Sequence, residues 1–195
     1  MNEFLLPCSS WSITQNIGAS HYGHSLQYQY QMYPPYLFKP LFEFTIRKMK
    51  EMGKKEIQTF LISGTLTGKI STVRKDGRPH VVPIWFILDK DDSNIKVVFT
   101  TGQDSSKAKH MLRDPRVSLC VDDQTPPFSF VVIDGIAEII KEPDLRELLK
   151  WATKIAGRYM GRDNAEAYGK RNAVKGEFLV RIRPTKVIAQ KDMVG

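Results

Sequence analysis

A succession of apolar, β-type runs separated by turn signals constrains the fold of this chain more than any other feature. The first two runs lie in "GTLTGKISTVRKDGRPHVVPIWFILD" (residues 64–89) and meet at Asp76-Gly77, a dipeptide typical of hairpin turns. Later runs of the same kind occupy residues 95–101, 115–122, 128–140 and 176–190, the last as one strand or a pair. We therefore expect about six strands, with chain neighbours pairing, and a candidate β-bulge at Gly135.

Helical periodicity is confined to a few segments. "KKEIQTFLIS" (residues 54–63) has the apolar spacing of a short amphipathic helix. The one long helix is expected in "KEPDLRELLKWATKIAGRYMG" (residues 141–161), and a second helical piece over residues 163–173. The apolar stripe of the long helix comprises Leu145, Leu148, Leu149, Ala152 and Ile155. The pattern predicts a mainly β fold, an antiparallel barrel with helical decoration around one core.

Composition restricts the class of protein and of partner. With 195 residues, of which 42% are hydrophobic and 26% charged, the chain is expected to form one soluble domain. No apolar run approaches the length of a membrane span and no secretory signal is recognisable, so we expect a cytoplasmic protein without a membrane partner. The two cysteines, Cys8 and Cys120, predict no disulfide framework. The net charge of +8 favours an anionic partner: nucleic acid, an acidic lipid surface or a phosphorylated small molecule.

The N-terminal part of the chain differs from the rest in charge. Residues 1–38 contain one charged residue, Glu3, while residues 39–195 contain the other 49. We interpret residues 1–48 as an irregular extension and residues 49–195 as the folded domain, or else place the functional start at Met49 or Met52. His21-x-x-His24 has no carboxylate or cysteine cluster nearby, so no metal site is expected.

The second β-type run contains a proline at its centre. Pro83 has no N–H to donate to a β-ladder, so the strand is expected to be an edge strand or to be bulged there. One interpretation is a proline that only protects a sheet edge. The other is that the segment Val82, Pro83, Ile84 and Trp85 leaves backbone groups free to bond the polar rim of a flat heterocycle. Trp85 would then lie beside that ring, on the face shared by Val81 and Pro83.

A polar corner follows the third run, in "TTGQDSSKAKHMLRDPRVSL" (residues 100–119). Asp104 or Ser105 is a suitable N-cap for a short helix over residues 106–113, which Asp114-Pro115 ends. The free N–H groups of such a helix start favour an anion, Ser105 and Ser106 add hydroxyls, and Lys107 adds a positive charge. From these residues alone, an anion site and a solvated helix face are equally supported.

Other chemistries have little support in the sequence. Lys109, His110 and Arg113 are expected to be surface charges rather than ligands. His80 and His110 are not accompanied by a nucleophile elbow, paired carboxylates, a metal-ligand spacing or a glycine-rich nucleotide loop. The strands are aliphatic and lack the aromatic platforms of single-strand nucleic-acid binders, so nucleic acid is not expected as a partner.

Four segments, taken in order, resemble the pyridoxamine 5′-phosphate oxidase-like superfamily of split β-barrel flavoproteins. They are "GKISTVRKDGRPHVVPIWFIL", "VVFTTGQDSSKAKHMLRDPRVSLCVDD", "FVVIDGIAEI" and "VRIRPTKVI", and the resemblance covers about residues 54–190. It implies a six-stranded antiparallel split β-barrel of the FMN-binding type that forms a homodimer, with the cofactor at the subunit interface. By matching position, the cofactor phosphate would lie at Ser105, Ser106 and Lys107, beside Thr100 and Thr101. The segment Val82–Trp85 would lie along the ring system.

Within this superfamily, the chain most resembles the branch of FMN- or F-420 (deazaflavin)-dependent oxidoreductases, and F-420 is favoured over FMN by a modest margin. It implies hydride transfer to a small organic substrate, with no catalytic residue assigned. Family members often carry arginine where this chain has Ser106, and the tryptophan- and arginine-containing C-terminal segment of the vitamin oxidases is not present in "AQKDMVG". Two alternatives stay open: a non-catalytic flavin- or haem-binding module on the same barrel, and a basic nucleic-acid-binding barrel.

Overall fold

The computed structural model describes residues 50–89 and 95–194. The expectations for residues 1–48, including Cys8 and the His21/His24 pair, fall outside the described residues. The elements follow the chain in this order: β1 (Lys50–Glu51), α1 (Lys54–Leu61), β2 (Gly68–Val73), β3 (Pro79–Ile84), β4 (Ile87–Asp89), β5 (Lys96–Gly102), α2 (Ser106–Arg113), β6 (Arg116–Asp123), β7 (Ser129–Ile140), α3 (Leu145–Met160), α4 (Arg162–Asn172) and β8 (Glu177–Lys191).

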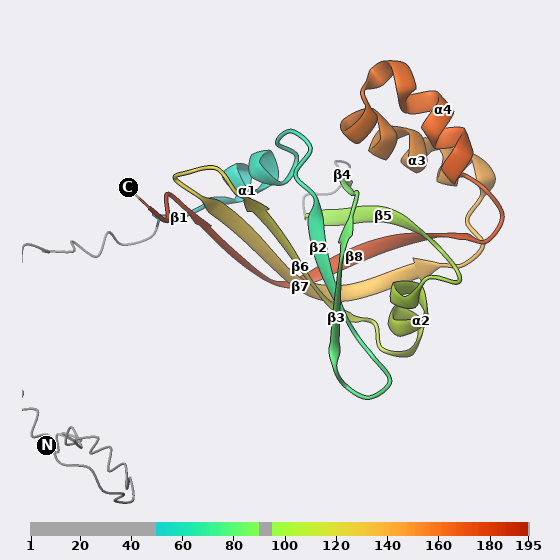
Figure 1. Ribbon diagram of the computed structural model, residues 1–195, viewed down its shortest axis with the longest axis horizontal. Coiled ribbons are helices and arrows are strands. Elements are labelled where there is room, and N and C mark those ends of the chain that lie inside the picture. The colour runs from blue at the N-terminus through green and yellow to red at the C-terminus, as the bar shows by residue number, and fades with distance from the viewer. Residues whose placement is uncertain (1–49, 90–94, 195) are drawn as a thin grey trace, which may run out of the picture. The chain divides into compact units, whose positions relative to one another are not determined.

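The strands form one antiparallel sheet in the order β3-β2-β6-β7-β8-β5-β4, with the short β1 added to β8 (Figure 1). The six long strands are those expected from the sequence, and the last run forms one strand rather than a pair. The expectation that chain neighbours pair is correct for β2–β3, β4–β5, β6–β7 and β7–β8. It fails for β2–β6 and β5–β8, which pair segments far apart in sequence.

The two ends of this sheet are joined by only two residues, Trp85 and Phe86. The run that the sequence indicates as one strand is therefore divided: β3 pairs with β2, and β4 pairs with β5 at the opposite end. In Figure 1, β2 and β3 run at a steep angle to β7 and β8, as expected for a strongly coiled sheet. The fold is a mainly β, antiparallel split barrel with four helices in the described part of the chain.

Glycine is required at the bulge in the fifth long strand. The register between β7 and β8 shifts between Asp134 and Gly135, which confirms the expected position. A Cβ on Gly135 would lie 2.6 Å from the backbone oxygen of Arg183, closer than real Cβ atoms approach. The glycine thus allows the two strands to approach each other at the bulge.

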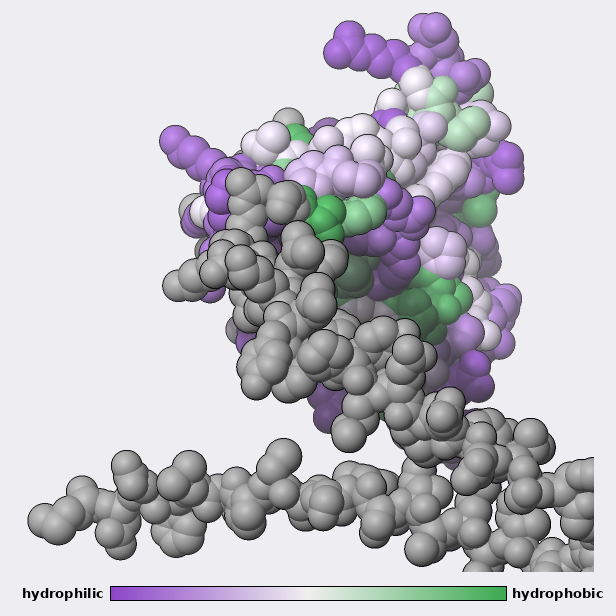
Figure 2. All heavy atoms as spheres, turned by 60° about the vertical axis from the view of Figure 1, so that its left-hand side comes forward, coloured by the Kyte–Doolittle hydropathy of each residue, from purple (hydrophilic) through white to green (hydrophobic). Residues whose placement is uncertain are grey.

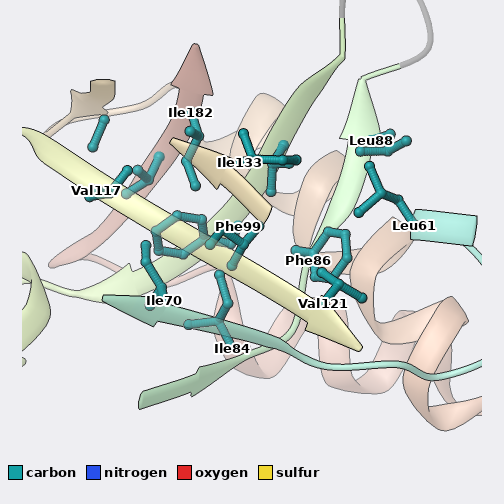
Figure 3. Close-up of a cluster of buried hydrophobic side chains, with 14 of the residues drawn as sticks. Leu61, Ile70, Ile84, Phe86, Leu88, Phe99, Val117, Val121, Ile133 and Ile182 are labelled. Atoms are coloured by element: carbon teal, nitrogen blue, oxygen red, sulfur yellow. The ribbon is translucent and has the colours of Figure 1, made fainter. Parts of the chain in front are cut away.

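The core lies inside the curved sheet. Ile84 and Phe86 point into it beside Phe99 and Val121 (Figure 3), while Val81 and Trp85 remain 59% and 39% exposed. The alternation of inward and outward residues therefore continues from β3 through the two joining residues. This confirms that Val81, Pro83 and Trp85 share one exposed face.

Helix α3 covers the sheet on the side of β5 and β8. Leu148 and Trp151 pack against Val98 of β5 and Leu179 of β8. The other buried side chains of α3 are Ala152, Ile155 and Ala156. Leu145 is 61% exposed, so its place in the expected apolar stripe is wrong: at the first helical position it lies at the rim of a surface cavity instead.

None of the helices among the described residues is long and apolar enough to cross a bilayer. Figure 2 shows one face, where the coloured residues are mostly hydrophilic or intermediate and hydrophobic ones gather in limited patches.

Candidate functional site

The corner between β5 and α2 is built by two hydroxyls. Ser105 is the N-cap of α2: its Oγ accepts a hydrogen bond from the amide of Ala108 at 3.2 Å and lies 2.9 Å from Oγ1 of Thr101. Thr101 is only 3% exposed, so its hydroxyl supports the cap from within the protein. The amides of Ser106 and Lys107, the first two of the helix, have no helical carbonyl to bond to and are available for an anion.

Lys107 is half-buried at this corner rather than on a fully solvated face. Burial lowers the pKa of its ammonium group, and the carboxylate of Glu177 acts in the opposite direction. Glu177 opens β8 opposite Gly102 of β5, with Thr100 two residues before that glycine. Burial raises the pKa of Glu177, and the contacts with Thr100 and Lys107 partly offset this rise. Sequence reasoning missed Glu177, since only the β5–β8 register brings it here.

The edge strand β3 supplies the second group of expected residues. β3 has β2 as its neighbour and ends the sheet, so Pro83 does lie in an edge strand, and its register with Lys69 is continuous rather than bulged. Trp85 follows the strand and stacks on Tyr159, with ring centroids 5.0 Å apart and planes at 3°. One edge of the segment Val82–Trp85 is thus without a strand partner in the described structure, as the hypothesis of a ring-binding edge requires.

An arginine from α3 fixes the chain where β3 passes into β4. Arg158 donates hydrogen bonds to four backbone carbonyls: Phe86 (3.0 Å), Leu61 (2.8 Å), Gly64 (3.0 Å) and Leu66 (3.2 Å). Its guanidinium carbon lies 4.5 Å from the centroid of the Phe86 ring. Burial lowers the pKa of Arg158. One side chain therefore joins the end of α1, the loop after it and the start of β4.

Tyr159 completes this contact. Its hydroxyl donates to the carbonyl of Leu66 at 2.9 Å and accepts from the amide of Phe86 at 3.3 Å. Burial raises the pKa of the phenol. Neither Arg158 nor Tyr159 was expected at the site, because each is one polar residue on a helix and no local pattern distinguishes it from surface residues. We call Trp85, Phe86, Arg158 and Tyr159 the aromatic crossover.

The two histidines meet between α2 and the β2–β3 hairpin. The His80 and His110 rings are in edge contact, with centroids 5.2 Å apart, and Nδ1 of His110 lies 3.0 Å from Oγ1 of buried Thr72. Arg113 donates to the carbonyl of Val73. Burial, then His80 and Arg113, lower the pKa of His110. His110 and Arg113 therefore both attach α2 to β2, and the expectation that they are surface charges rather than ligands stays a prediction.

Helix α2 relates the corner to the edge strand. Its first turn forms the corner, and His110, near its other end, contacts His80, two residues before Val82. The expected residues therefore fall into two groups joined by one short helix. A cavity of about 610 Å³, lined by residues of α1, β5 and β8 such as Ile57, belongs to neither group.

Comparison with known proteins gives matches over the same part of the chain. The model of the family described as pyridoxamine 5′-phosphate oxidase matches residues 54–191. A conserved hypothetical protein of Mycobacterium tuberculosis has a similar structure, with 28% identity, a TM-score of 0.62, and coverage of 72% of this chain and 86% of that one.

Two further structures share the fold at lower identity. General Stress Protein 26 of Bacillus anthracis is 22% identical, with a TM-score of 0.53 and coverage of 71% of this chain and 95% of that one. The haem storage protein HutZ of Vibrio cholerae is 16% identical, with a TM-score of 0.54 and coverage of 70% and 94%. The likeness to these two concerns the fold alone.

Proposed function

Because the chain belongs to the pyridoxamine 5′-phosphate oxidase family, we propose that it is an oxidoreductase that binds F-420 or FMN and transfers a hydride to a small organic substrate. The observation that carries the proposal is the arrangement around α2. The amides at one end of this helix and Lys107 would face an anion. His110, near the other end, contacts β3, an edge strand whose outer side has no strand partner among the described residues. A phosphorylated planar cofactor needs both kinds of surface.

The residues present fit the two parts of such a cofactor. The amides of Ser106 and Lys107, the Ser106 hydroxyl and the Lys107 ammonium group would hold the phosphate, with Thr100 beside them. Ser105 and Thr101 would position this corner through their mutual hydrogen bond. The family resemblance favours F-420 over FMN, and the replacement of a commonly found arginine by Ser106 leaves a corner with one positive charge fewer for the phosphate.

The edge segment would bind the ring system. Backbone groups from Val82 to Trp85, including Pro83 and Ile84, would face the polar rim of the ring, and Trp85 would lie beside it. The cofactor, when bound, supplies the redox chemistry, and the protein holds it, orients it and excludes water from the ring. We assign no general acid or base.

A second subunit would complete the site. Val81 is 59% exposed and Trp85 39% exposed, and a ring lying on this edge would be open to solvent on its outer side. A homodimer with the cofactor between its subunits would cover both the ring and these side chains.

The test is reconstitution of the purified chain with F-420, FMN and riboflavin, followed by absorbance and fluorescence. We expect F-420 or FMN to bind at micromolar concentration, and riboflavin, which has no phosphate, to bind more weakly. Binding of neither phosphorylated cofactor would reject the proposal. A cofactor that binds but is not turned over with any reductant or substrate would support a non-catalytic flavin- or haem-binding module instead.

A further inference from the structure

A half-buried carboxylate lies among the groups that would bind the phosphate. Glu177 lies opposite Gly102 across the β5–β8 pair, with its Oε2 3.5 Å from the position of a Cβ on that glycine. Thr100 lies two residues before Gly102 on the same strand, and its side chain and the ammonium group of Lys107 both favour the charged form of the Glu177 carboxylate. The carbonyl of Gly102 accepts from the amide of Ser105, the helix cap, at 3.1 Å. The acid therefore belongs to the corner itself.

The other charges around Glu177 lie on its solvent side. Lys141, Glu142 and Lys175 are exposed and line, together with Glu177, a cavity of about 300 Å³. Exposed charges of this kind are screened by water and salt, whereas the half-buried pair Glu177 and Lys107 interacts through a less polarisable medium. Lys141 and Lys175 therefore line the solvent side of the same carboxylate.

We propose that Glu177 competes with the cofactor phosphate for Thr100 and Lys107, and so sets the affinity and the pH dependence of anion binding at the corner. The inference rests on the proposed function, because it assigns a regulatory role within the same site. A phosphate at the start of α2 would be repelled by the Glu177 charge. It binds once the carboxylate has turned toward the lysine-lined cavity or has taken up a proton.

The expected pH dependence follows from this competition. Burial already raises the pKa of Glu177, and a phosphate nearby raises it further, so binding is coupled to proton uptake. A phosphodiester keeps its charge in this range, so its affinity for the corner should rise as the pH falls toward the pKa of Glu177. The ring hydroxyl of F-420 also ionises near neutral pH, so for F-420 the ratio between variant and wild-type affinity is compared at each pH. The phosphate of FMN takes up a proton near pH 6. For FMN the informative quantity is therefore the ratio between the affinities of the variant and the wild type at each pH.

The experiment compares the full chain with the Glu177→Gln variant in titrations with F-420, FMN, riboflavin and inorganic phosphate. We expect Glu177→Gln to bind F-420 and FMN about three- to tenfold more tightly at pH 8, with a smaller difference at pH 5.5. Riboflavin should bind both proteins equally. Glu138→Gln is the matched control, because it changes the net charge by the same amount. Glu138 pairs with Arg183 on the outer surface, so the cofactor affinity of this variant should stay at the wild-type value.

Each outcome of these titrations either supports or overturns the proposed role of Glu177. Equal or weaker cofactor binding by Glu177→Gln, with Glu177→Ala as the substitute if that variant does not fold, would overturn the inference and leave Glu177 as a residue that positions Lys107. If no cofactor binds to any variant, the proposed function is rejected, and inorganic phosphate then tests the inference alone. Tighter phosphate binding by the variant would support it, and no phosphate binding by either protein would overturn it.

Discussion

The corner and the aromatic crossover are two halves of one candidate site, but they are assembled in opposite ways. Apart from Glu177, the corner comes from eight successive residues, 100–107, and its structure is a local helix cap. The crossover joins three separate stretches of chain, residues 61–66, 85–86 and 158–159, which meet at the carbonyls that Arg158 and Tyr159 bind. A local motif can be recognised from residue types, whereas a long-range assembly exists only in the fold.

The difference also predicts where substitutions act. At the corner, Ser106 is exposed and Lys107 half-buried, so their side chains are free to serve a ligand. At the crossover, side chains bond backbone carbonyls of which most are partly buried, and their loss leaves these acceptors without donors. Substitutions at the crossover should therefore lower the free energy of unfolding, and those at the corner should mainly lower cofactor affinity.

The largest effect is expected for Arg158→Ala. It removes the donors for four carbonyls and should lower the free energy of unfolding by about 3–5 kcal/mol. Urea denaturation measures this change, with Arg162→Ala, an exposed arginine at the start of α4, as the control. A loss below 1 kcal/mol would show that the crossover is held by apolar packing and not by these hydrogen bonds.

Tyr159→Phe tests the same region with a smaller change. It removes the hydroxyl that bonds Leu66 and Phe86 but keeps the ring stacked on Trp85, and should cost about 1.5 kcal/mol of unfolding free energy. Trp85 should retain its environment, which near-UV circular dichroism can report. A change in that spectrum would indicate that the hydroxyl, rather than the stacked ring, positions the tryptophan.

At the corner, Ser105→Ala should cost about 1 kcal/mol through loss of the N-cap. Ser106→Ala removes the hydroxyl of the next residue, which does not cap the helix. It should change the free energy of unfolding by no more than about 0.5 kcal/mol. Thermal denaturation of the two variants side by side checks the assignment. Equal losses would mean that Ser105 is not the cap on which the corner depends.

The smallest effect on stability is expected for Lys107→Ala, within about 0.5 kcal/mol, together with a fall in cofactor affinity of about tenfold. Fluorescence titration with F-420 or FMN provides the affinity, and Lys109→Ala, an exposed lysine on the same helix, provides the control. Unchanged affinity in Lys107→Ala would remove the lysine from the phosphate site.

Much of the fold was accessible from the sequence because its signals are local. The turn at Asp76-Gly77, the bulge at Gly135 and the edge position of Pro83 each follow from the backbone chemistry of one or two residues. The division of the second run at Trp85 and Phe86 was not accessible. The run stays apolar across the break, and only the pairing of its two halves with opposite ends of the sheet requires it.

The candidate site divides in the same way. Ser105, Ser106 and Lys107 could be proposed from helix-capping rules, and the structure gives Ser105 the capping role. Arg158 and Glu177 could not be proposed from such rules, because their partners are distant in sequence. Phe86 lies 72 residues before Arg158, and Lys107 lies 70 residues before Glu177. A charged residue on a helix or at the start of a strand has no sequence feature that distinguishes such a role.

The most direct test of the account is a crystal structure of the chain with bound F-420 or FMN. We expect the phosphate within about 3 Å of the amides of Ser106 and Lys107, and the ring system along Val82–Trp85 at an interface between two subunits. A cofactor bound in the cavity between α1 and β8, or a phosphate away from the start of α2, would contradict it.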